Sequence, residues 1–222
     1  QTCDIIEYNR HCCHRCFFQS GTDIKIFYRR IQEENQNNQT MIYTCTYLSP
    51  LGNILLAADE TGLTGLWFES QKYFARTLPD VRISKETEIL TETKKWLDIY
   101  FSGQEPTFTP PLHPVGSTFR QEVWQILLQI PYGQTITYGE IAGRIAEARN
   151  VSHMSAQAVG GAVGHNEISI IIPCHRVVGT NGSLTGYAGG IDKKISLLEL
   201  EHADMSRLFP VYDPEPEKLS TI

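Results

Sequence analysis

Apolar and polar residues alternate along three short segments in the first half of the chain, a pattern typical of half-buried strands. The segments are residues 43–47, 53–58 and 63–68. Residues 49–52 (Ser-Pro-Leu-Gly) and 59–62 (Asp-Glu-Thr-Gly) separate them with residue types that favour turns. The pattern therefore predicts an antiparallel meander of three strands.

A helical pattern follows the meander. Apolar residues recur at roughly helical spacing between residues 87 and 101, and Ser102-Gly103 ends the helix. Four prolines then lie between residues 104 and 114. We therefore predict a first lobe over residues 41–103 and a linker over residues 104–116. Cys45 lies in a strand-like context, and we expect it to be packed.

The second domain is expected to cover residues 117–203 and to begin with a helix. Thr118 is the expected N-cap of this helix, because a threonine side chain can accept from the first free backbone N–H groups. Val123, Ile126 and Leu127 give it an apolar face. Residues 131–133 (Pro-Tyr-Gly) terminate it.

Two further helices follow at short distance. Thr137 precedes a helix over residues 138–147, and Ser155 caps a helix of small apolar residues. A turn at residues 150–153 joins the two. This arrangement matches a helix-turn-helix, although any pair of short helices gives the same pattern.

One apolar run in this half ends in residues with catalytic potential. Residues 170–172 are three isoleucines, which predict a short buried strand, and Pro173 turns the chain at its end. Cys174 and His175 then lie at the exit of the strand. A thiol beside an imidazole can gain thiolate character, which is the nucleophilic form. A lone cysteine is more often buried and inert, so the flanking residues must decide.

Glycines are frequent on both sides of Cys174 and His175, as a tight pocket for a planar ligand requires. The segments are Gly160-Gly161-Ala162, Gly164-His165-Asn166, Gly179-Thr180-Asn181-Gly182 and Gly186-Tyr187-Ala188-Gly189-Gly190. Together with these glycines, four features resemble the O6-alkylguanine-DNA alkyltransferase family. They are Asn166, Pro173-Cys174-His175-Arg176-Val177, Tyr187 and the Leu-Leu-x-x-Glu motif that ends at Glu201. The resemblance covers roughly residues 41–202 and is strongest from Thr118 onward.

The resemblance implies an α+β protein, with a small N-terminal α/β (ribonuclease-H-like) lobe and a mostly helical C-terminal lobe carrying a helix-turn-helix. It implies repair of double-stranded DNA that carries alkylated guanine. The alkyl group of O6-alkylguanine, and also of O4-alkylthymine, would move irreversibly to Cys174, once per protein and without a cofactor or metal. The target base must leave the duplex stack to be reached.

The resemblance also implies roles for the residues around the thiol. Glu201 orients His175, and His175 takes the proton of Cys174 through a bound water. Asn166 holds the turn at residues 177–178 by side-chain hydrogen bonds. Glu199 is the alternative to Glu201, because only the spacing from the two leucines selects position 201. Arg176 is expected to be structural, docking the two lobes or a helix C-terminus.

DNA contacts are expected from the helix-turn-helix, whose second helix lies in the minor groove in this family. Ala156 and Gly160 suit a close approach to the sugar-phosphate wall. Tyr138 matches the tyrosine that rotates the target phosphate, although it can equally pack on the core. Gln157 stands where the family usually has an arginine that fills the space of the flipped base. Since glutamine brings no cation, we expect weaker DNA binding.

The base pocket is expected around Tyr187, whose ring would stack on the guanine unless it is a core aromatic. The backbones of Ala188 and Gly189 would lie near the modified oxygen. The main-chain carbonyls of Cys174 and Val177 would accept from the guanine amino group.

Composition narrows the class of protein further. The net charge is −6 and the pI is about 5.6, which argues against a non-specific polyanion binder. A DNA site must therefore rest on a local surface and a shape-specific pocket. No apolar run is long enough to span a membrane, and residues 1–4 do not resemble a secretory signal. A reactive thiol favours a reducing compartment, so we expect a cytoplasmic protein. We also expect it to be a monomer.

The two ends differ from the rest of the sequence. Residues 1–40 contain Cys3 and the run His11-Cys12-Cys13-His14-Arg15-Cys16, which lacks the two separated ligand pairs of a zinc finger. We interpret residues 1–40 as a disordered leader, with Met41 as the natural start of the domain, and expect no metal. Residues 204–222 are expected to form a loosely held tail.

Three other functions are weighed against repair. Relatives that only recognise alkylated guanine have tryptophan at the nucleophile position, where this chain has Cys174. A Cys–His hydrolase needs the two side chains to face each other, which adjacent residues rarely achieve. A transcription factor that responds to alkylation needs an added domain that residues 1–40 are too short to supply.

Overall fold

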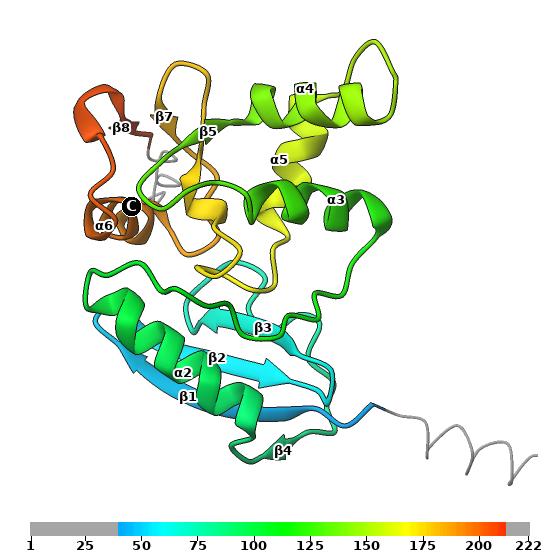
Figure 1. Cartoon of the computed structure of the whole chain (residues 1–222), viewed down its shortest axis with the longest axis vertical. Helices are drawn as coiled ribbons and strands as arrows, with labels where there is room; N and C mark the ends of the chain where they lie inside the picture. Colours follow the sequence, from blue (N-terminus) through cyan, green and yellow to red (C-terminus); the bar gives the residue numbers. More distant parts are fainter. Residues whose placement is uncertain (1–39, 212–222) are drawn as a thin grey trace, which may run out of the picture. The chain divides into compact units, whose positions relative to one another are not determined.

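The computed structural model describes residues 40–211 of the 222-residue chain (Figure 1). From Met41 onward the described residues belong to one unit, within which an N-terminal sheet lobe and a C-terminal helical lobe are distinguished. The leader predicted at residues 1–40 lies, except for Thr40, outside the described residues. Among residues 40–211, no helix combines the length and the apolar character that crossing a membrane requires.

The N-terminal lobe contains the predicted meander. The strands β1 (Tyr43–Ser49), β2 (Gly52–Ala58) and β3 (Leu63–Phe68) pair antiparallel in sequence order, which confirms the prediction. A short strand β4 (Ile83–Ser84) pairs in parallel with β1, so the order of the sheet is β3-β2-β1-β4. β4 was not predicted, because two exposed residues carry no periodic pattern.

The helix α2 (Glu88–Phe101) covers one face of this sheet (Figure 1). It begins after Thr87, whose side chain accepts from the backbone N–H of Leu90. The helical prediction for residues 87–101 is therefore confirmed. Its buried residues Leu97 and Tyr100 share the apolar core with Leu56 of β2.

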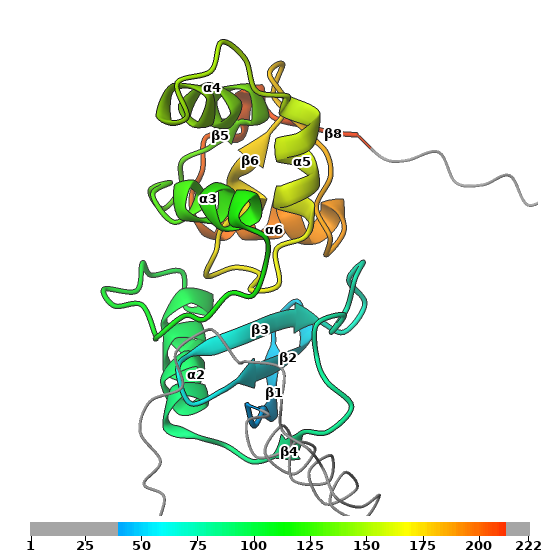
Figure 2. The ribbon, with the colours of Figure 1, turned by 90° about the vertical axis from the view of Figure 1, so that its right-hand side faces the viewer.

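The C-terminal lobe is built on four helices and short strand pairs (Figure 2). The helices are α3 (Thr118–Leu127), α4 (Tyr138–Ala148), α5 (Ala156–Gly164) and α6 (Ile191–Leu200). The short strands are β5 (Ile136–Thr137), β6 (Val177–Val178), β7 (Ser183–Leu184) and β8 (Phe209–Pro210). β5 pairs in parallel with β6, and β7 with β8.

The helix starts follow the cap residues with one correction. Thr137 forms a complete capping box with Glu140 at the start of α4, and Ser155 caps α5 through the backbone N–H of Ala158. Both caps confirm the predictions. The predicted cap of α3 is wrong, because the side chain of Ser117, not Thr118, accepts from the Arg120 N–H.

The prediction of a strand at residues 170–172 is also wrong. The isoleucines are buried, but they lie in a turn in which Ile170 has a φ of 68° and the Ile172 N–H donates to the Ile168 carbonyl. The nearest strand contact is a single bridge between Leu66 and Ile168. A short apolar run reports burial and does not distinguish a strand from a buried loop.

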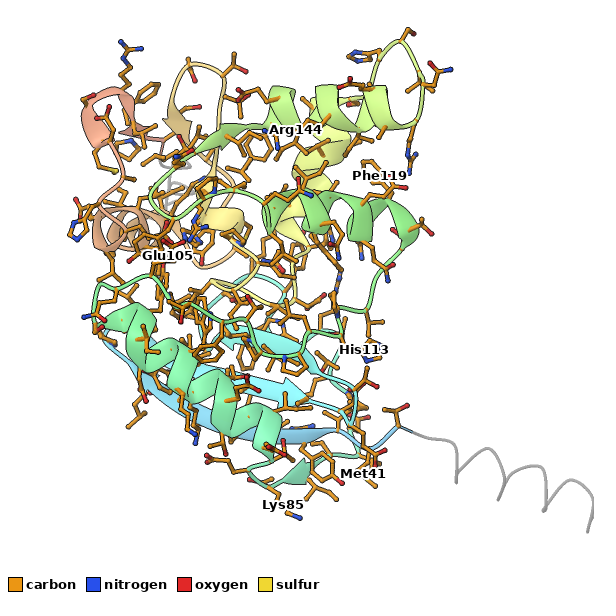
Figure 3. All side chains as sticks on the ribbon, viewed as in Figure 1. Met41, Lys85, Glu105, His113, Phe119 and Arg144 are labelled. Carbon is orange, nitrogen blue, oxygen red and sulfur yellow. The ribbon has the colours of Figure 1, made fainter. Side chains whose placement is uncertain are left out.

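The segments around the lobes are held more firmly than the sequence suggests. The expected linker pairs with β3, since Leu63 N–H donates to the Pro111 carbonyl at 2.7 Å and His113 N–H to the Leu63 carbonyl at 2.8 Å. His113, labelled in Figure 3, also contacts the buried Asp59 carboxylate through Nδ1 at 2.6 Å. The expectation of a loose tail is wrong for residues 204–211, because β8 pairs with β7.

Candidate active site

Cys174 begins a 3₁₀ turn, Cys174–Arg176, that directly follows Pro173. Its side chain is 6% exposed, and Sγ accepts a hydrogen bond from Asn166 Nδ2 at 3.1 Å. Burial raises the pKa of the Cys174 thiol, while the Asn166 bond and the charge of Lys194 act in the opposite direction. The resting side chain is therefore a thiol, which needs a base before it can act as a nucleophile.

Asn166 organises the loop before this thiol. Its Nδ2 donates to the carbonyls of Ile168 at 3.2 Å and Ile172 at 2.8 Å, and its Oδ1 accepts from the Ile168 N–H at 3.0 Å. The predicted contact with the turn at residues 177–178 is wrong. Asn166 instead closes the loop of residues 168–172 and contacts the sulfur directly.

His175 and Glu201 form a buried pair, with Nε2 and Oε1 2.7 Å apart. Because the carboxylate accepts, we assign the ring hydrogen to Nε2, which leaves Nδ1 with its lone pair. Nδ1 is buried and has no hydrogen-bond partner within residues 40–211. Burial lowers the pKa of His175 against the opposing charge of Glu201, so the imidazole is neutral at pH 7 and its Nδ1 can accept a proton.

Glu201 is the C-cap of α6 and accepts from several donors besides His175. The Tyr100 hydroxyl donates to Oε1 at 2.7 Å, and Arg176 donates to Oε2 through Nε at 2.8 Å and to Oε1 through Nη2 at 3.0 Å. Although burial opposes ionisation, the His175 and Arg176 interactions hold the pKa of Glu201 well below its usual range. Glu199 is exposed, so the structure selects Glu201 as the partner of His175.

Arg176 has a structural environment, as predicted. Besides its two bonds to Glu201, its Nη1 donates to the Ile130 carbonyl at 2.6 Å, just beyond the end of α3. Its guanidinium also lies over the ring of Tyr132, 5.6 Å from the centroid. Arg176 therefore ties the catalytic turn to the segment that follows α3.

A cavity of about 720 Å³ opens between α5 and the loop before α6. Gly160, Tyr187 and Ala188, three of the residues predicted to contact the substrate, line it. The Tyr187 and His175 rings pack in a T-shaped arrangement, with the centroids 6.4 Å apart and an interplanar angle of 80°. A Cβ on Gly189 would lie 2.7 Å from the Tyr187 ring, so this close approach requires glycine.

The other predicted contact residues lie at the edges of this region. Tyr138, at the start of α4, donates to the Thr185 carbonyl at 3.3 Å and lies beside Gly160. Ala156 and Gln157 are exposed on the first turn of α5 and do not line the cavity. The arrangement gives a buried thiol and a neutral imidazole with a free ring nitrogen. Neither Cys174 nor His175 lines the cavity, and Tyr187, which does, packs against the His175 ring.

The comparisons with known proteins assign the family. Residues 42–114 match the model described as 6-O-methylguanine DNA methyltransferase, ribonuclease-like domain. Residues 118–203 match the model described as 6-O-methylguanine DNA methyltransferase, DNA binding domain. A methylated-DNA--protein-cysteine methyltransferase of Methanosarcina acetivorans is 44% identical over 160 residues, which are 72% of this chain and 98% of that relative. The chain belongs to the 6-O-methylguanine DNA methyltransferase family.

Other members of the 6-O-methylguanine DNA methyltransferase family support the assignment. The Haemophilus influenzae methylated-DNA--protein-cysteine methyltransferase is 41% identical, over 73% of this chain and 87% of that relative. The crystal structure of the Mycobacterium tuberculosis O6-methylguanine methyltransferase is 42% identical with a TM-score of 0.61, over 72% of this chain and 93% of that chain. A structure of the M. tuberculosis protein in complex with DNA gives a TM-score of 0.62, at 42% identity and over 72% and 92% of the two chains. The family resemblance inferred from the sequence is confirmed.

Lys194 is a further residue of the site in this member of the 6-O-methylguanine DNA methyltransferase family, and it was not predicted from the sequence. Its side chain is buried, and Nζ donates to the Val177 carbonyl at 2.6 Å and the Thr185 carbonyl at 2.9 Å. Burial lowers the pKa of Lys194 to about 8. The signal that could have found it is its position three and four residues before Leu197 and Leu198, on the buried face of α6.

Tyr100, the other residue missed, comes from the N-terminal lobe. It lies on the buried face of α2, where the sequence indicates only an apolar core residue and does not reveal the hydrogen-bond partner of its hydroxyl. For metal binding, residues 40–211 contain no group of three or more His, Cys, Asp or Glu side chains close enough to hold an ion. The Cys/His run at residues 11–16 lies outside the part of the chain that the structure describes.

Proposed function

We propose that this chain repairs DNA by moving the alkyl group of O6-alkylguanine to its own Cys174. One observation supports this most directly. The Cys174 sulfur is hydrogen-bonded to Asn166, and the next residue, His175, is held by Glu201 with Nδ1 left without a partner. The names of the relatives, methylated-DNA--protein-cysteine methyltransferases, describe this reaction.

The chemistry balances without a cofactor or an oxidant. His175 Nδ1 accepts the thiol proton of Cys174 through one water, and Glu201 stabilises the resulting imidazolium. The sulfur lone pair forms the new S–C bond while the O6–C bond breaks, and its electron pair stays on the guanine. The departing guanine anion takes up one proton, and the His175 imidazolium gives up the proton that it received from the thiol, so the reaction neither gains nor loses a proton overall. A thioether is not reversed by thiol exchange, so each chain acts once.

The DNA contacts in this proposal come from α4 and α5, acting as a helix-turn-helix with α5 in the minor groove. Ala156 and Gly160 approach the sugar-phosphate backbone, Gln157 fills the space of the flipped base and Tyr138 turns the target phosphate. The exposure of Ala156 and Gln157 supports this assignment.

The flipped base would enter the cavity beside α5. Tyr187, which lines the cavity, would stack on it. The backbones of Ala188, also in the lining, and of the next residue, Gly189, would face the modified oxygen. The Val177 carbonyl already accepts from Lys194, so a guanine amino group would use its second lone pair. We further propose that the protein is a monomer and that its N-terminal lobe is ribonuclease-H-like. Because the reaction consumes a free thiol, we propose that it takes place in a reducing compartment such as the cytoplasm.

The test is the intact mass of the protein after incubation with a duplex that contains O6-methylguanine, followed by peptide mapping. We expect a gain of one methylene group at Cys174 that saturates at one per chain. Cys174→Ser should abolish the gain, and Cys45→Ser, which removes the other described free cysteine, should keep it. Tight binding to the modified duplex with no mass gain would instead indicate a damage sensor and would contradict the proposal.

A further inference from the structure

Glu167 is a buried carboxylate that the proposed reaction does not use. It is 3% exposed and follows Asn166 directly in the sequence. Its two oxygens are bound by residues of the other lobe: Oε2 accepts from Trp67 Nε1 at 2.9 Å, and Oε1 accepts from Arg76 Nη2 at 2.9 Å. Removing a carboxylate from water carries a large desolvation penalty, which these two contacts offset. The position of Glu167 between the lobes therefore calls for an explanation.

The backbone around Glu167 is attached to the same lobe. The Leu66 N–H donates to the Glu167 carbonyl at 2.8 Å, and the Ser169 N–H donates to the Leu66 carbonyl at 3.0 Å. The Ser169 hydroxyl also donates to Gln71 Oε1 at 3.2 Å. Residues 167–169 therefore extend the edge of β3, with the Glu167 side chain as the charged part of the attachment.

The Trp67 ring that binds Glu167 is itself fixed in place. A Cβ built on Gly65 would lie 1.8 Å from the Trp67 ring, so the ring lies flat over that glycine. The indole N–H is thereby directed at Glu167 by a fully packed side chain. Arg76 is 37% exposed and lies between the Glu167 carboxylate and the solvent.

The attachment continues to the nucleophile through short, buried steps. Asn166 and Ile168 flank Glu167 and are bound to each other through Asn166 Oδ1 and the Ile168 N–H. Asn166 Nδ2 then reaches both the Ile172 carbonyl and the Cys174 sulfur. A displacement of Glu167 would therefore move the donor that contacts the thiol.

We propose that Glu167 is a positioning residue for the alkyl transfer. It anchors the loop of residues 166–172 to β3 and to Trp67, and so fixes the Asn166 amide at the Cys174 sulfur. The N-terminal lobe thereby takes part in setting the geometry of the nucleophile. This inference rests on the proposed function, since it concerns the rate at which Cys174 accepts an alkyl group.

The test is Glu167→Gln, which keeps the size of the side chain and one acceptor oxygen but removes the charge that pairs with Arg76. The rate constant of methyl transfer is measured at saturating duplex, beside the affinity for that duplex. We expect transfer to slow about tenfold, because small errors in the placement of reacting groups carry large rate costs. The affinity should stay within about twofold, since Glu167 is buried, does not line the cavity and follows the C-terminal end of α5, whereas the proposed DNA contacts lie at the start of that helix.

The matched control is Glu69→Gln, which removes an exposed carboxylate of the N-terminal lobe that accepts from Asn53. This variant should transfer at the wild-type rate. A second readout is the rate of Cys174 alkylation by iodoacetamide as a function of pH, which reports the apparent thiol pKa without DNA. In Glu167→Gln this apparent pKa should rise, because the Asn166 donor that favours the thiolate is displaced.

The outcomes separate this inference from the function itself. If wild-type protein gains no mass at Cys174, the proposed function fails. If wild-type protein transfers normally while Glu167→Gln transfers equally fast with an unchanged thiol pKa, the positioning role is wrong. If Glu167→Gln has a lower melting temperature but an unchanged transfer rate, Glu167 stabilises the fold without positioning the nucleophile, and the inference is likewise wrong. If Arg76→Gln slows transfer and the double variant is no slower than either single one, the ion pair is the operative contact.

Discussion

Glu201 is the single residue on which most of the buried polar groups of the site converge. Its carboxylate accepts from His175, Arg176, Tyr100 and the Gly133 N–H, all in an environment shielded from water. These donors explain why it stays ionised despite its burial. They also fix the His175 tautomer, because every polar group around the carboxylate acts as a donor.

We therefore expect Glu201→Gln to slow alkyl transfer strongly. An amide offers one acceptor oxygen in place of two and turns N–H groups toward donors, so it no longer stabilises a charged His175. A loss of about 10²–10³ in transfer rate corresponds to losing general-base assistance. DNA affinity should change little, and single-turnover rates with a binding titration check both.

The matched control for this change is Glu199→Gln. Glu199 lies two residues away at the end of α6, is exposed and should tolerate the change with a normal rate. Equal rates for Glu201→Gln and wild-type protein would refute the relay between Glu201, His175 and Cys174.

Single residues also show where the sequence could identify the site and where it could not. Cys174, His175 and Glu201 were found through a motif, and the structure brings them together. Tyr100 and Lys194 were missed because each reads as an ordinary helical residue. Only the fold reveals that the Tyr100 hydroxyl contacts Glu201 and that Lys194 lies close enough to influence Cys174.

Among the elements, α5 carries the position at which we expect a departure from the family pattern. Gln157 lies exposed on its first turn, where related proteins are expected to carry an arginine. The position is followed by small residues up to Gly164, so the helix can approach a surface closely. Because the chain carries a net charge of −6, a single added cation on this helix should measurably raise the affinity for DNA.

We expect Gln157→Arg to bind alkylated duplex more tightly than the wild-type protein. An arginine adds a cation and a planar group that stacks on bases, so the gain should be about three- to tenfold at low salt. Titrations of one duplex at several salt concentrations check this, and the gain should shrink as the salt rises. Gln121→Arg adds the same charge to an exposed position on α3 and should give a smaller gain. Equal affinities for Gln157→Arg and wild-type protein at one salt concentration would contradict the expectation.

The elements were predictable where local chemistry specifies them. Alternation predicted the meander, and Thr137 and Ser155 marked two helix starts, whereas the predicted cap Thr118 lies one residue inside α3. The loop of residues 168–172 was not predictable, because its conformation depends on the Asn166 side chain and on the edge of β3. Apolar composition indicated only that these residues are buried.

For the molecule as a whole, the contacts between the lobes were beyond the reach of the sequence. Glu167 binds Trp67 across 100 residues and Arg76 across 91 residues, and no local pattern connects positions so far apart. The nucleophile loop is consequently held by residues that sequence analysis assigned to a separate, supporting lobe. Stability and chemistry should therefore be coupled in this protein.

The repaired state offers a direct measure of that coupling. Cys174 is 6% exposed and belongs to the apolar core cluster, so a methyl group on its sulfur must fit into a packed environment. Inserting one extra carbon into a well-packed core typically costs about 1–3 kcal/mol. The added methyl group must also be accommodated beside the Asn166 amide, which contacts the same sulfur at 3.1 Å.

We therefore expect the methylated protein to be less stable than the unmodified protein. Each kcal/mol should lower the melting temperature by about 2–4 °C for a chain of this size. The measurement compares protein of verified mass before and after reaction, with the DNA removed. Cys174→Ser taken through the same incubation controls for the handling and should show no shift. An unchanged or higher melting temperature would mean that the loop of residues 166–172 relaxes around the methyl group, and hence that the Glu167 anchor does not hold it rigidly.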